Sequence, residues 1–295
     1  MNSDFSFHLA TPRKRFGQHF LHDPGVLARI IAAINPKLGE NVIEIGPGRG
    51  ALTLPLLREI GRLEAIELDR DLIPYLQKRC AAAGELIIHQ ADALSFDFSS
   101  LTSRGMPRLV GNLPYNVATP LLFHILDQLH PTELSPGPPR MIDMHFMLQR
   151  EVVDRLVAHP GESSYGRLSV MIQSRCRVER LFTVSAGAFH PPPRVESAVA
   201  RLLPHAIPPV VIADYLHFEY LVRQVFSQRR KTVRNTLRGL LTDSAIESAG
   251  VDPSDRPEVL SMNQFARLTQ EWSASLKRNQ KDVSSLSVRS YAVEK

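Results

Sequence analysis

The stretch VIEIGPGRG (residues 42–50) decides the fold of this chain. Residues 42–45 form a short apolar run that is typical of a buried strand, and the glycines after it predict a tight turn. Residues 51–57 have a helical pattern, which Pro55 shortens or kinks. A strand, a glycine turn and a helix in succession bring backbone N–H groups up to a ligand, because glycine leaves no Cβ in the way.

The glycine turn alone is compatible with more than one function. Gly46, Gly48 and Ala51 match the dinucleotide-binding pattern G-x-G-x-x-G/A. Glu67 lies about 20 residues further on, where that pattern has its ribose-binding acid. A nicotinamide-dependent oxidoreductase is therefore one hypothesis. A plain strand-to-helix turn that uses glycine only for its geometry is the other.

The composition is that of a globular protein with a basic balance. The chain has 295 residues, enough for one large domain and a small one, with 43% apolar and 22% charged residues. The net charge of +5 and the isoelectric point of about 9.4 suit a polyanionic partner. No apolar run approaches the length of a membrane span, and residues 1–10 lack the pattern of a signal peptide.

The cysteines and histidines give no sign of a metal site. Cys80 and Cys176 are the two cysteines, and neither they nor the 11 histidines have the spacing of metal ligands. We therefore expect no metal, two ordinary thiols and a reduced, cytoplasmic setting.

The order of the predicted elements indicates an α/β fold. Strands are predicted at residues 63–67, 86–90, 108–110, 141–149, 177–184 and 197–203. Helices are predicted at residues 24–34, 71–83, 119–129, 150–158 and 167–174. Up to residue 129, the alternation of strands and helices predicts a parallel, doubly wound sheet with connections on both faces.

The pattern of predicted elements changes after a linker at residues 204–209. We expect a Rossmann-like domain with a basic N-terminal arm over residues 1–206. Residues 207–272 have helical patterns without strand signals, which predicts a small all-helical domain. Residues 273–295 are polar without clear periodicity, and we expect a disordered tail there.

Four predicted strand ends carry the residues that a nucleoside pocket needs. Ligands of a doubly wound sheet bind beyond the carboxyl ends of its strands, where the strand order reverses. The glycine turn follows the first strand and Asn112 follows the fourth, so we expect them to face each other. Glu67 and Asp92 follow the second and third strands. They provide one acid for ribose hydroxyls and one for an adenine amino group.

The segment Asn112-Leu113-Pro114-Tyr115 distinguishes among nucleoside-using enzymes. Hydride transfer has no use for it, whereas methyl transfer to the adenine amine does, because the lone pair of that amine is delocalised into the ring. The Asn112 side-chain oxygen and a backbone carbonyl at Pro114 can each accept one N–H of the amine. They thereby direct its lone pair at the methyl donor, and such positioning carries most of the catalysis.

Two aromatic residues are candidates for stacking on the acceptor base. Tyr115 would cover one face, and Phe189, on a loop stiffened by prolines 191–193, would cover the other. Stacking one base contributes roughly 1–3 kcal/mol, which helps to offset the cost of splaying an adenine out of a hairpin. The alternative is that Tyr115 packs in a turn and that Phe189 belongs to the core.

Two basic segments are candidates for RNA contact. The first is the arm Arg13-Lys14-Arg15. The second holds arginines that recur every four or seven residues, which would make one stripe on a helix: Arg223, Arg230, Arg234 and Arg238, with Arg229 and Lys231 beside them. Such a stripe in a basic protein favours phosphate contact over a merely solvated face.

In combination, the motifs resemble those of the small-subunit ribosomal RNA adenine dimethyltransferases. The resemblance covers residues 13–268. Its motifs are GQHFL (17–21), EIGPGRG (44–50), GNLPYN (111–116), EVVDRL (151–156), YGRLSV (165–170), FHPPPRV (189–195) and QRRKT (228–232).

The resemblance implies a Rossmann-like methyltransferase domain, a small helical domain and S-adenosylmethionine as methyl donor. It implies N6,N6-dimethylation of two adjacent adenosines in a hairpin loop near the 3′ end of the small-subunit (16S) rRNA. Family members often carry asparagine where this chain has His19. The implied cofactor-binding residues are His19, Leu21, Gly46, Gly48, Glu67, Asp92 and Asn112.

The leading hypothesis is thus a cytoplasmic, monomeric rRNA adenine N6-dimethyltransferase that acts on the assembling small ribosomal subunit. A close alternative is a large-subunit rRNA adenine methyltransferase of the antibiotic-resistance type. A third is a non-catalytic assembly factor that binds pre-rRNA and keeps only the fold.

Overall fold

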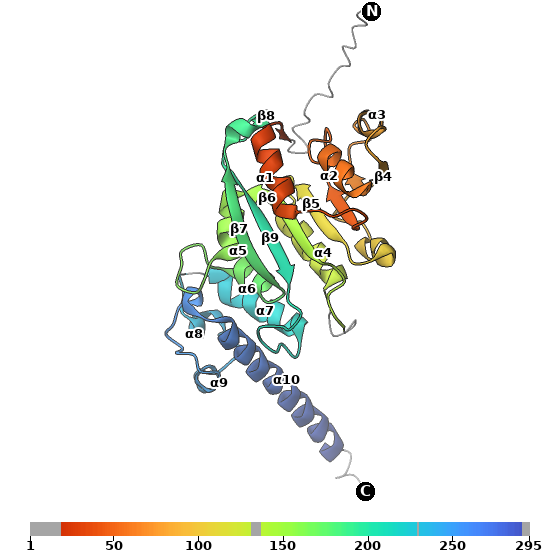
Figure 1. Cartoon of the computed structure of the whole chain (residues 1–295). Helices are drawn as coiled ribbons and strands as arrows, with labels where there is room; N and C mark the ends of the chain where they lie inside the picture. The colour runs from red at the N-terminus through yellow and green to blue at the C-terminus, as the bar shows by residue number, and fades with distance from the viewer. Residues whose placement is uncertain (1–18, 131–136, 229, 291–295) are drawn as a thin grey trace, which may run out of the picture. The chain divides into compact units, whose positions relative to one another are not determined.

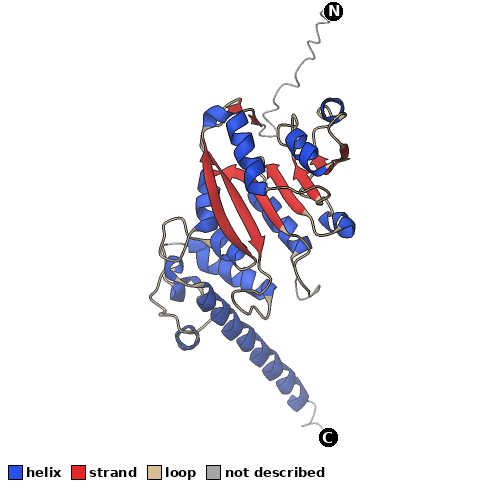
Figure 2. Ribbon diagram, in the orientation of Figure 1, coloured by secondary structure: helices blue, strands red, loops and turns tan. Residues whose placement is uncertain are grey.

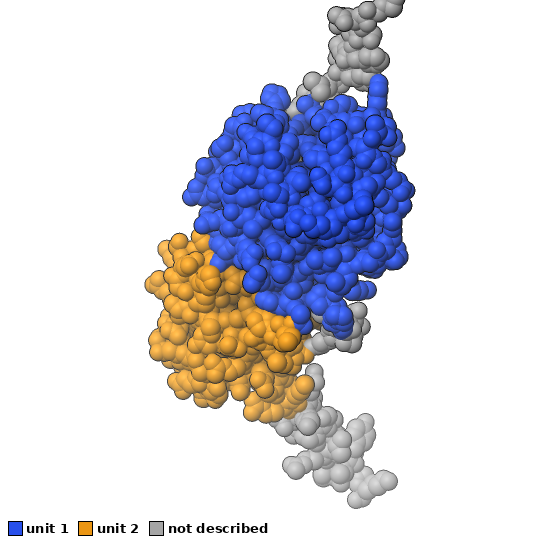
Figure 3. Space-filling view, viewed as in Figure 1, with its two compact units in different colours: residues 1–131, 135–157, 175–206 blue, residues 132–134, 158–174, 207–295 orange. Residues whose placement is uncertain are grey.

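The structure is a computed structural model that describes residues 19–130, 137–228 and 230–290 (Figure 1). The chain divides into two compact units, coloured separately in Figure 3. Unit 1 comprises residues 1–131, 135–157 and 175–206, and unit 2 comprises residues 132–134, 158–174 and 207–295.

A seven-stranded sheet forms the centre of unit 1, with helices around it (Figure 2). Its strand order is β4-β3-β2-β5-β6-β9-β7. The strands are β2 (Val42–Ile45), β3 (Arg62–Glu67), β4 (Glu85–Gln90), β5 (Arg108–Asn112), β6 (Asp143–Gln149), β7 (Cys176–Val184) and β9 (Ser197–Pro204). The helices of this unit are α1 (Pro24–Ile34), α2 (Thr53–Ile60), α3 (Ile73–Cys80), α4 (Ala118–Leu129) and α5 (Arg150–Val157).

The sheet is parallel from β4 to β6, and its other edge is antiparallel. The parallel sheet predicted from the strands up to residue 110 is confirmed for β4, β3, β2 and β5, whereas β9 pairs antiparallel with both β6 and β7. The reason lies in the connection from Val184 to Ser197, which contains no α-helix. Parallel neighbours need a long crossover, so a chain that returns without a helix pairs antiparallel.

Local sequence explains the elements that lead into the site. Strand β2, which leads into the glycine turn, is buried along its whole length, as its apolar run predicts. The predicted start of α1 is confirmed: the Asp23 side chain accepts a hydrogen bond from the N–H of Val26 at 2.8 Å. α1 and α2 cover one face of the sheet with a core that includes Ile30, Leu56 and Leu57.

Unit 2 is helical within its described residues. Its helices are α6 (Arg167–Gln173), α7 (Tyr215–Val225), α8 (Val233–Thr236), α9 (Asp243–Ser248) and α10 (Met262–Ser290). The sequence analysis assigned residues 158–174 to the first domain. They belong instead to unit 2, because α6 packs against α7, where the Tyr215 hydroxyl donates to the carbonyl of Met171 at 3.3 Å.

Two further predictions for this region differ from the structure. α7 ends at Val225 and α8 begins only at Val233, so the arginines between 223 and 238 do not form a stripe on one helix. α10 continues to Ser290, where a disordered tail was predicted. Residues 262–290 contain neither glycine nor proline, so no residue in this segment breaks the helix.

A short two-stranded sheet lies apart from the central one. β1 (Phe20–Leu21) pairs antiparallel with β8 (Phe189–His190). Among the helices of the described ranges, none combines the length and the apolar character that crossing a membrane requires.

Candidate functional site

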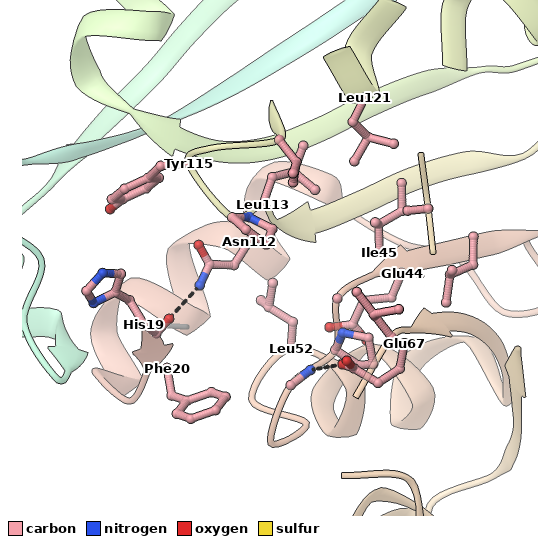
Figure 4. A pocket seen from close by; sticks show the side chains of 18 of the residues that line it. His19, Phe20, Glu44, Ile45, Leu52, Glu67, Asn112, Leu113, Tyr115 and Leu121 are labelled. Atoms are coloured by element: carbon pink, nitrogen blue, oxygen red, sulfur yellow. Dashed lines mark hydrogen bonds between the residues drawn. The ribbon is translucent and has the colours of Figure 1, made fainter. Parts of the chain in front are cut away.

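A cavity of about 320 Å³ lies at the carboxyl ends of the parallel strands (Figure 4). A volume of this size is at the lower end for small-ligand pockets. The cavity brings together most of the site residues that the sequence analysis singled out. Those that line it are His19, Leu21, Gly46, Gly48, Glu67, Asp92, Asn112, Pro114 and Tyr115.

The glycine turn is as tight as predicted. Gly46, Gly48 and Gly50 have φ values of 68°, 56° and 76°, in the left-handed region that glycine adopts without strain. Their N–H groups are not bare, however. They donate to the carbonyl of Ile66 (2.9 Å), the carboxylate of Glu67 (3.1 Å) and the carbonyl of Pro47 (2.9 Å), respectively. The turn therefore holds the wall of the cavity together.

Glu67, the last residue of β3, is buried and held in place by backbone groups. Its two oxygens accept from the N–H of Gly48 at 3.1 Å and of Asp69 at 2.8 Å. Burial raises the pKa of Glu67, and these hydrogen bonds oppose the rise. Each oxygen keeps a further lone pair, so the carboxylate retains the capacity to accept hydroxyl groups.

Glu44 is a cavity residue that the sequence analysis did not single out. It lies within β2, is 2% exposed, and its Oε2 has no hydrogen-bond partner. Burial raises the pKa of Glu44 to about 8, an effect that Thr53 partly offsets and Glu67 increases. One signal for it was present in the sequence: a charged residue inside an otherwise apolar strand.

Asn112 is the last residue of β5, where its side chain reaches the cavity. Its Nδ2 donates to the backbone carbonyl of His19 at 2.9 Å (Figure 4). Because the amide nitrogen is held in this way, Oδ1 is the acceptor that remains. The adjacent Gly111 was also missed as a site residue: a Cβ there would lie 2.5 Å from the carbonyl oxygen of Ile45, so only glycine lets β5 approach β2 this closely.

Pro114 and Tyr115 continue the wall from Asn112. The Pro114 carbonyl accepts from the N–H of Val117 at 3.2 Å and keeps a second lone pair. The Tyr115 hydroxyl lies 2.6 Å from the Ser197 hydroxyl. Burial raises the pKa of Tyr115 and the Ser197 contact lowers it in part. The ring of Tyr115 is therefore fixed at its outer end.

His19 lies next to Tyr115 in the wall of the cavity. The two rings are stacked, with centroids 5.8 Å apart and an interplanar angle of 26°. Nδ1 of His19 lies 2.8 Å from the carbonyl oxygen of Pro191. Phe20 follows, and a Cβ on Gly48 would lie 3.1 Å from its ring, while the Arg49 guanidinium lies 4.4 Å above it.

Phe189 does not line the cavity. It is 2% exposed and belongs to the core with Leu21, Ile30 and Val184. Its place in β8 opposite Leu21 turns the ring inward. The structure therefore does not show the predicted stacking role. It agrees with the alternative, in which Phe189 is a core residue.

The predicted RNA-binding residues lie partly outside the described structure. Arg13, Lys14, Arg15 and Arg229 fall on residues that it does not describe. The others are exposed in unit 2: Arg230, Lys231, Arg234 and Arg238. Arg234 is paired with Asp243, with Nε to Oδ2 at 2.8 Å. Within the described ranges, no group of three or more histidine, cysteine or acidic residues could hold a metal ion.

Comparison with known proteins identifies the family. The family model described as ribosomal RNA adenine dimethylase matches residues 10–273. The ribosomal RNA small subunit methyltransferase A of Nitrosococcus oceani is 55% identical over 263 residues, which cover 88% of this chain and 96% of that protein.

Solved structures agree with this family. A dimethyladenosine transferase from Plasmodium falciparum is similar with a TM-score of 0.70 and 25% identity, over 87% of this chain and 98% of that chain. The 23S rRNA methyltransferase ErmE shares the fold, with a TM-score of 0.67 and 23% identity over 86% and 99% of the two chains. The glycine turn is thus that of a methyltransferase fold, and the nicotinamide hypothesis is not supported. The chain belongs to the ribosomal RNA adenine dimethylase family.

Proposed function

We propose that this protein uses S-adenosyl-L-methionine to dimethylate the N6 atoms of two adjacent adenosines in the hairpin loop near the 3′ end of small-subunit (16S) rRNA. It acts as a monomer in the cytoplasm and contributes to small-subunit biogenesis. Its family makes it an rRNA adenine methyltransferase. The small-subunit assignment is supported by the 55% identity to a relative named for that subunit.

The observation that carries the proposal is the position of Asn112. It ends β5 in the same cavity as the glycine turn and Glu67, so one cavity holds groups suited to a nucleoside and groups suited to an acceptor amine. Asn112 Oδ1 and the Pro114 carbonyl accept the two amine N–H groups, and the Tyr115 ring stacks on the base. Fixing the amine in this way supplies the positioning on which methyl transfer depends.

The residues of the cavity fit the methyl donor. S-adenosylmethionine supplies a methyl group activated by a sulfonium. Glu67 accepts hydrogen bonds from ribose hydroxyls, and Asp92, exposed after β4, accepts one from the adenine amino group. Leu21, Gly46, Gly48 and the backbone of His19 complete the set that we assign to the donor, and a Cβ at Gly48 would lie only 3.1 Å from the Phe20 ring.

The replacement Asn112→Ala separates catalysis from binding. We expect transfer to fall by about 10²-fold or more, because the acceptor amine loses its position. Donor affinity should change by less than about tenfold, the equivalent of one hydrogen bond. Single-turnover transfer to small subunits and calorimetric titration with S-adenosylmethionine measure the two effects.

The controls for this experiment test the other hypotheses. Asn235→Ala, an exposed position on α8, should leave both quantities unchanged. Titration of the wild type with NAD should show no binding. Full transfer by Asn112→Ala would refute the assigned mechanism, and a wild type that binds subunits and donor but transfers nothing would favour the assembly factor.

A further inference from the structure

Glu44 is a buried acid whose carboxyl group the proposed reaction leaves unused. It is 2% exposed, and Oε2 has no hydrogen-bond partner, yet the residue lines the cavity (Figure 4). An ionised carboxylate is costly to bury without a partner. Oε2 itself is closed off from solvent, so a ligand in the cavity acts on this carboxyl through its charge, across a poorly solvated distance.

Among the described residues, those that shift the pKa of Glu44 include no positive charge. From β3, Glu67 adds a second acid; from α3, the Cys80 thiol interacts with the Glu44 charge; and from α2, Thr53 offers a hydroxyl. Arg49 lines the same cavity, but its guanidinium lies over the Phe20 ring. In this environment the pKa of Glu44 rises to about 8, so the free protein holds the acid protonated at neutral pH.

The donor and the product of the proposed reaction differ in charge. S-adenosylmethionine carries a carboxylate, an ammonium and a sulfonium, and its net charge is positive. S-adenosylhomocysteine has lost the sulfonium with the methyl group and is neutral overall. In a cavity of low dielectric constant, one additional positive charge favours the ionised form of a nearby acid.

We propose that Glu44 is the counter-charge of the methyl donor: its carboxyl is protonated in the free protein, releases that proton to solvent when S-adenosylmethionine binds, and takes a proton back when S-adenosylhomocysteine remains. This inference rests on the proposed function, because it assumes that donor. Since the ionised form stabilises only the cationic donor, the exchange favours binding of donor over product. Glu44 is therefore a specificity residue for the cofactor.

Calorimetry counts the proton directly. Binding enthalpies measured at pH 7 in buffers of different ionisation enthalpy give the number of protons released for each ligand. The amino group common to both ligands cancels in the difference between them. For the wild type we expect S-adenosylmethionine to release up to about 0.9 proton more than S-adenosylhomocysteine. The affinity ratio of donor to product should rise up to about eightfold between pH 6.5 and 7.5.

Glu44→Gln replaces the protonated acid by a neutral group of the same shape. We expect it to bind S-adenosylhomocysteine as the wild type does, to lose the difference in proton release, and to lose the pH dependence of the affinity ratio. Glu64→Gln is the matched control, because Glu64 is a buried acid of β3 that pairs with His89 at 2.8 Å and does not line the cavity. It should retain the wild-type difference.

A second measurement covers the case in which Glu44→Gln does not fold. The infrared band of a protonated carboxyl should be present in the free wild type, disappear with S-adenosylmethionine and persist with S-adenosylhomocysteine. Equal proton release for the two ligands, or an unchanged difference in Glu44→Gln, would overturn the inference. If neither ligand binds the wild type, the proposed function itself fails.

Discussion

His19 contributes to the cavity through two separate parts of the residue. Its backbone carbonyl accepts from Asn112 Nδ2 at 2.9 Å, and its ring stacks on Tyr115. Any residue at this position can supply the carbonyl. Only the ring is particular to histidine here, and it lies beside the residue that we assign to the acceptor base.

We expect His19→Ala to impair use of RNA more than binding of the donor. The ring is lost while the carbonyl that holds Asn112 stays, so donor affinity by calorimetry should remain within about threefold. The KM for small subunits should rise about tenfold, which is within the range that one ring contact contributes. His19→Phe, which keeps a ring, should recover most of the loss. A large loss of donor affinity with an unchanged KM for subunits would contradict this prediction and favour a cofactor-binding ring.

At the scale of elements, an ionic network links β5, β6 and β9. Asp143, fully buried at the start of β6, accepts from Arg108 at 2.9 and 3.0 Å and from Arg201 at 3.2 and 3.0 Å. Burial would raise the pKa of Asp143, but His145 and Arg108 outweigh it and hold the pKa well below its usual range. The network fixes the register of β5, whose other end carries Asn112.

The network makes stability dependent on pH in a defined direction. A carboxyl whose pKa is lowered by folding stabilises the protein above the pKa of the unfolded chain, and this stabilisation is lost as the pH falls. Asp143→Ala should therefore lower the free energy of unfolding by about 3 kcal/mol at pH 7, because Arg108 loses its buried partner, and by less at pH 3.

Urea unfolding at the two pH values measures this loss. Asp154→Ala removes a more exposed carboxylate, which pairs with Arg180 at 2.7 Å, and should cost less than about 1 kcal/mol. A loss for Asp143→Ala that is equally small, or independent of pH, would show that the network does not stabilise the sheet.

The sequence predicted those elements whose signals are local. The glycine turn, the start of α1 and the strand ends with Glu67, Asp92 and Asn112 follow from period and residue type over a few positions. The antiparallel pairing of β9 did not follow from such local signals, because strand pairing depends on contacts between distant segments. The burial of Phe189 was not foreseen for the same reason: only its pairing with Leu21 shows that its ring turns into the core. Glu44 was overlooked because an apolar pattern hides the one acid within it.

At the scale of the whole molecule, the basic charge of the chain, +5, agrees with the rRNA substrate that the family implies. Arg230 and Arg238 are exposed, whereas Arg234 already pairs with Asp243. An arginine that contacts phosphate releases counterions on binding, and a paired one releases fewer. Arg230 and Arg238 should therefore contribute more to the salt dependence of RNA binding than Arg234.

Replacing Arg230 and Arg238 together by glutamine should make RNA binding less sensitive to salt. The slope of log K against log salt should decrease in magnitude by about 2, or about one for each lost phosphate contact. Arg234→Gln should change it less. Arg58 and Arg70, exposed cations of unit 1, provide the matched double replacement, which should leave the slope unchanged. A slope equal to that of the wild type for Arg230 and Arg238 would mean that they form only a solvated face.

The most direct test of the account is nucleoside analysis of rRNA after incubation of the protein with S-adenosylmethionine and under-methylated small ribosomal subunits. The account predicts N6,N6-dimethyladenosine at two adjacent positions of the small-subunit rRNA, and none when S-adenosylmethionine is omitted. Absence of dimethyladenosine despite binding of donor and subunit, or its appearance only in large-subunit rRNA in a parallel reaction, would contradict it.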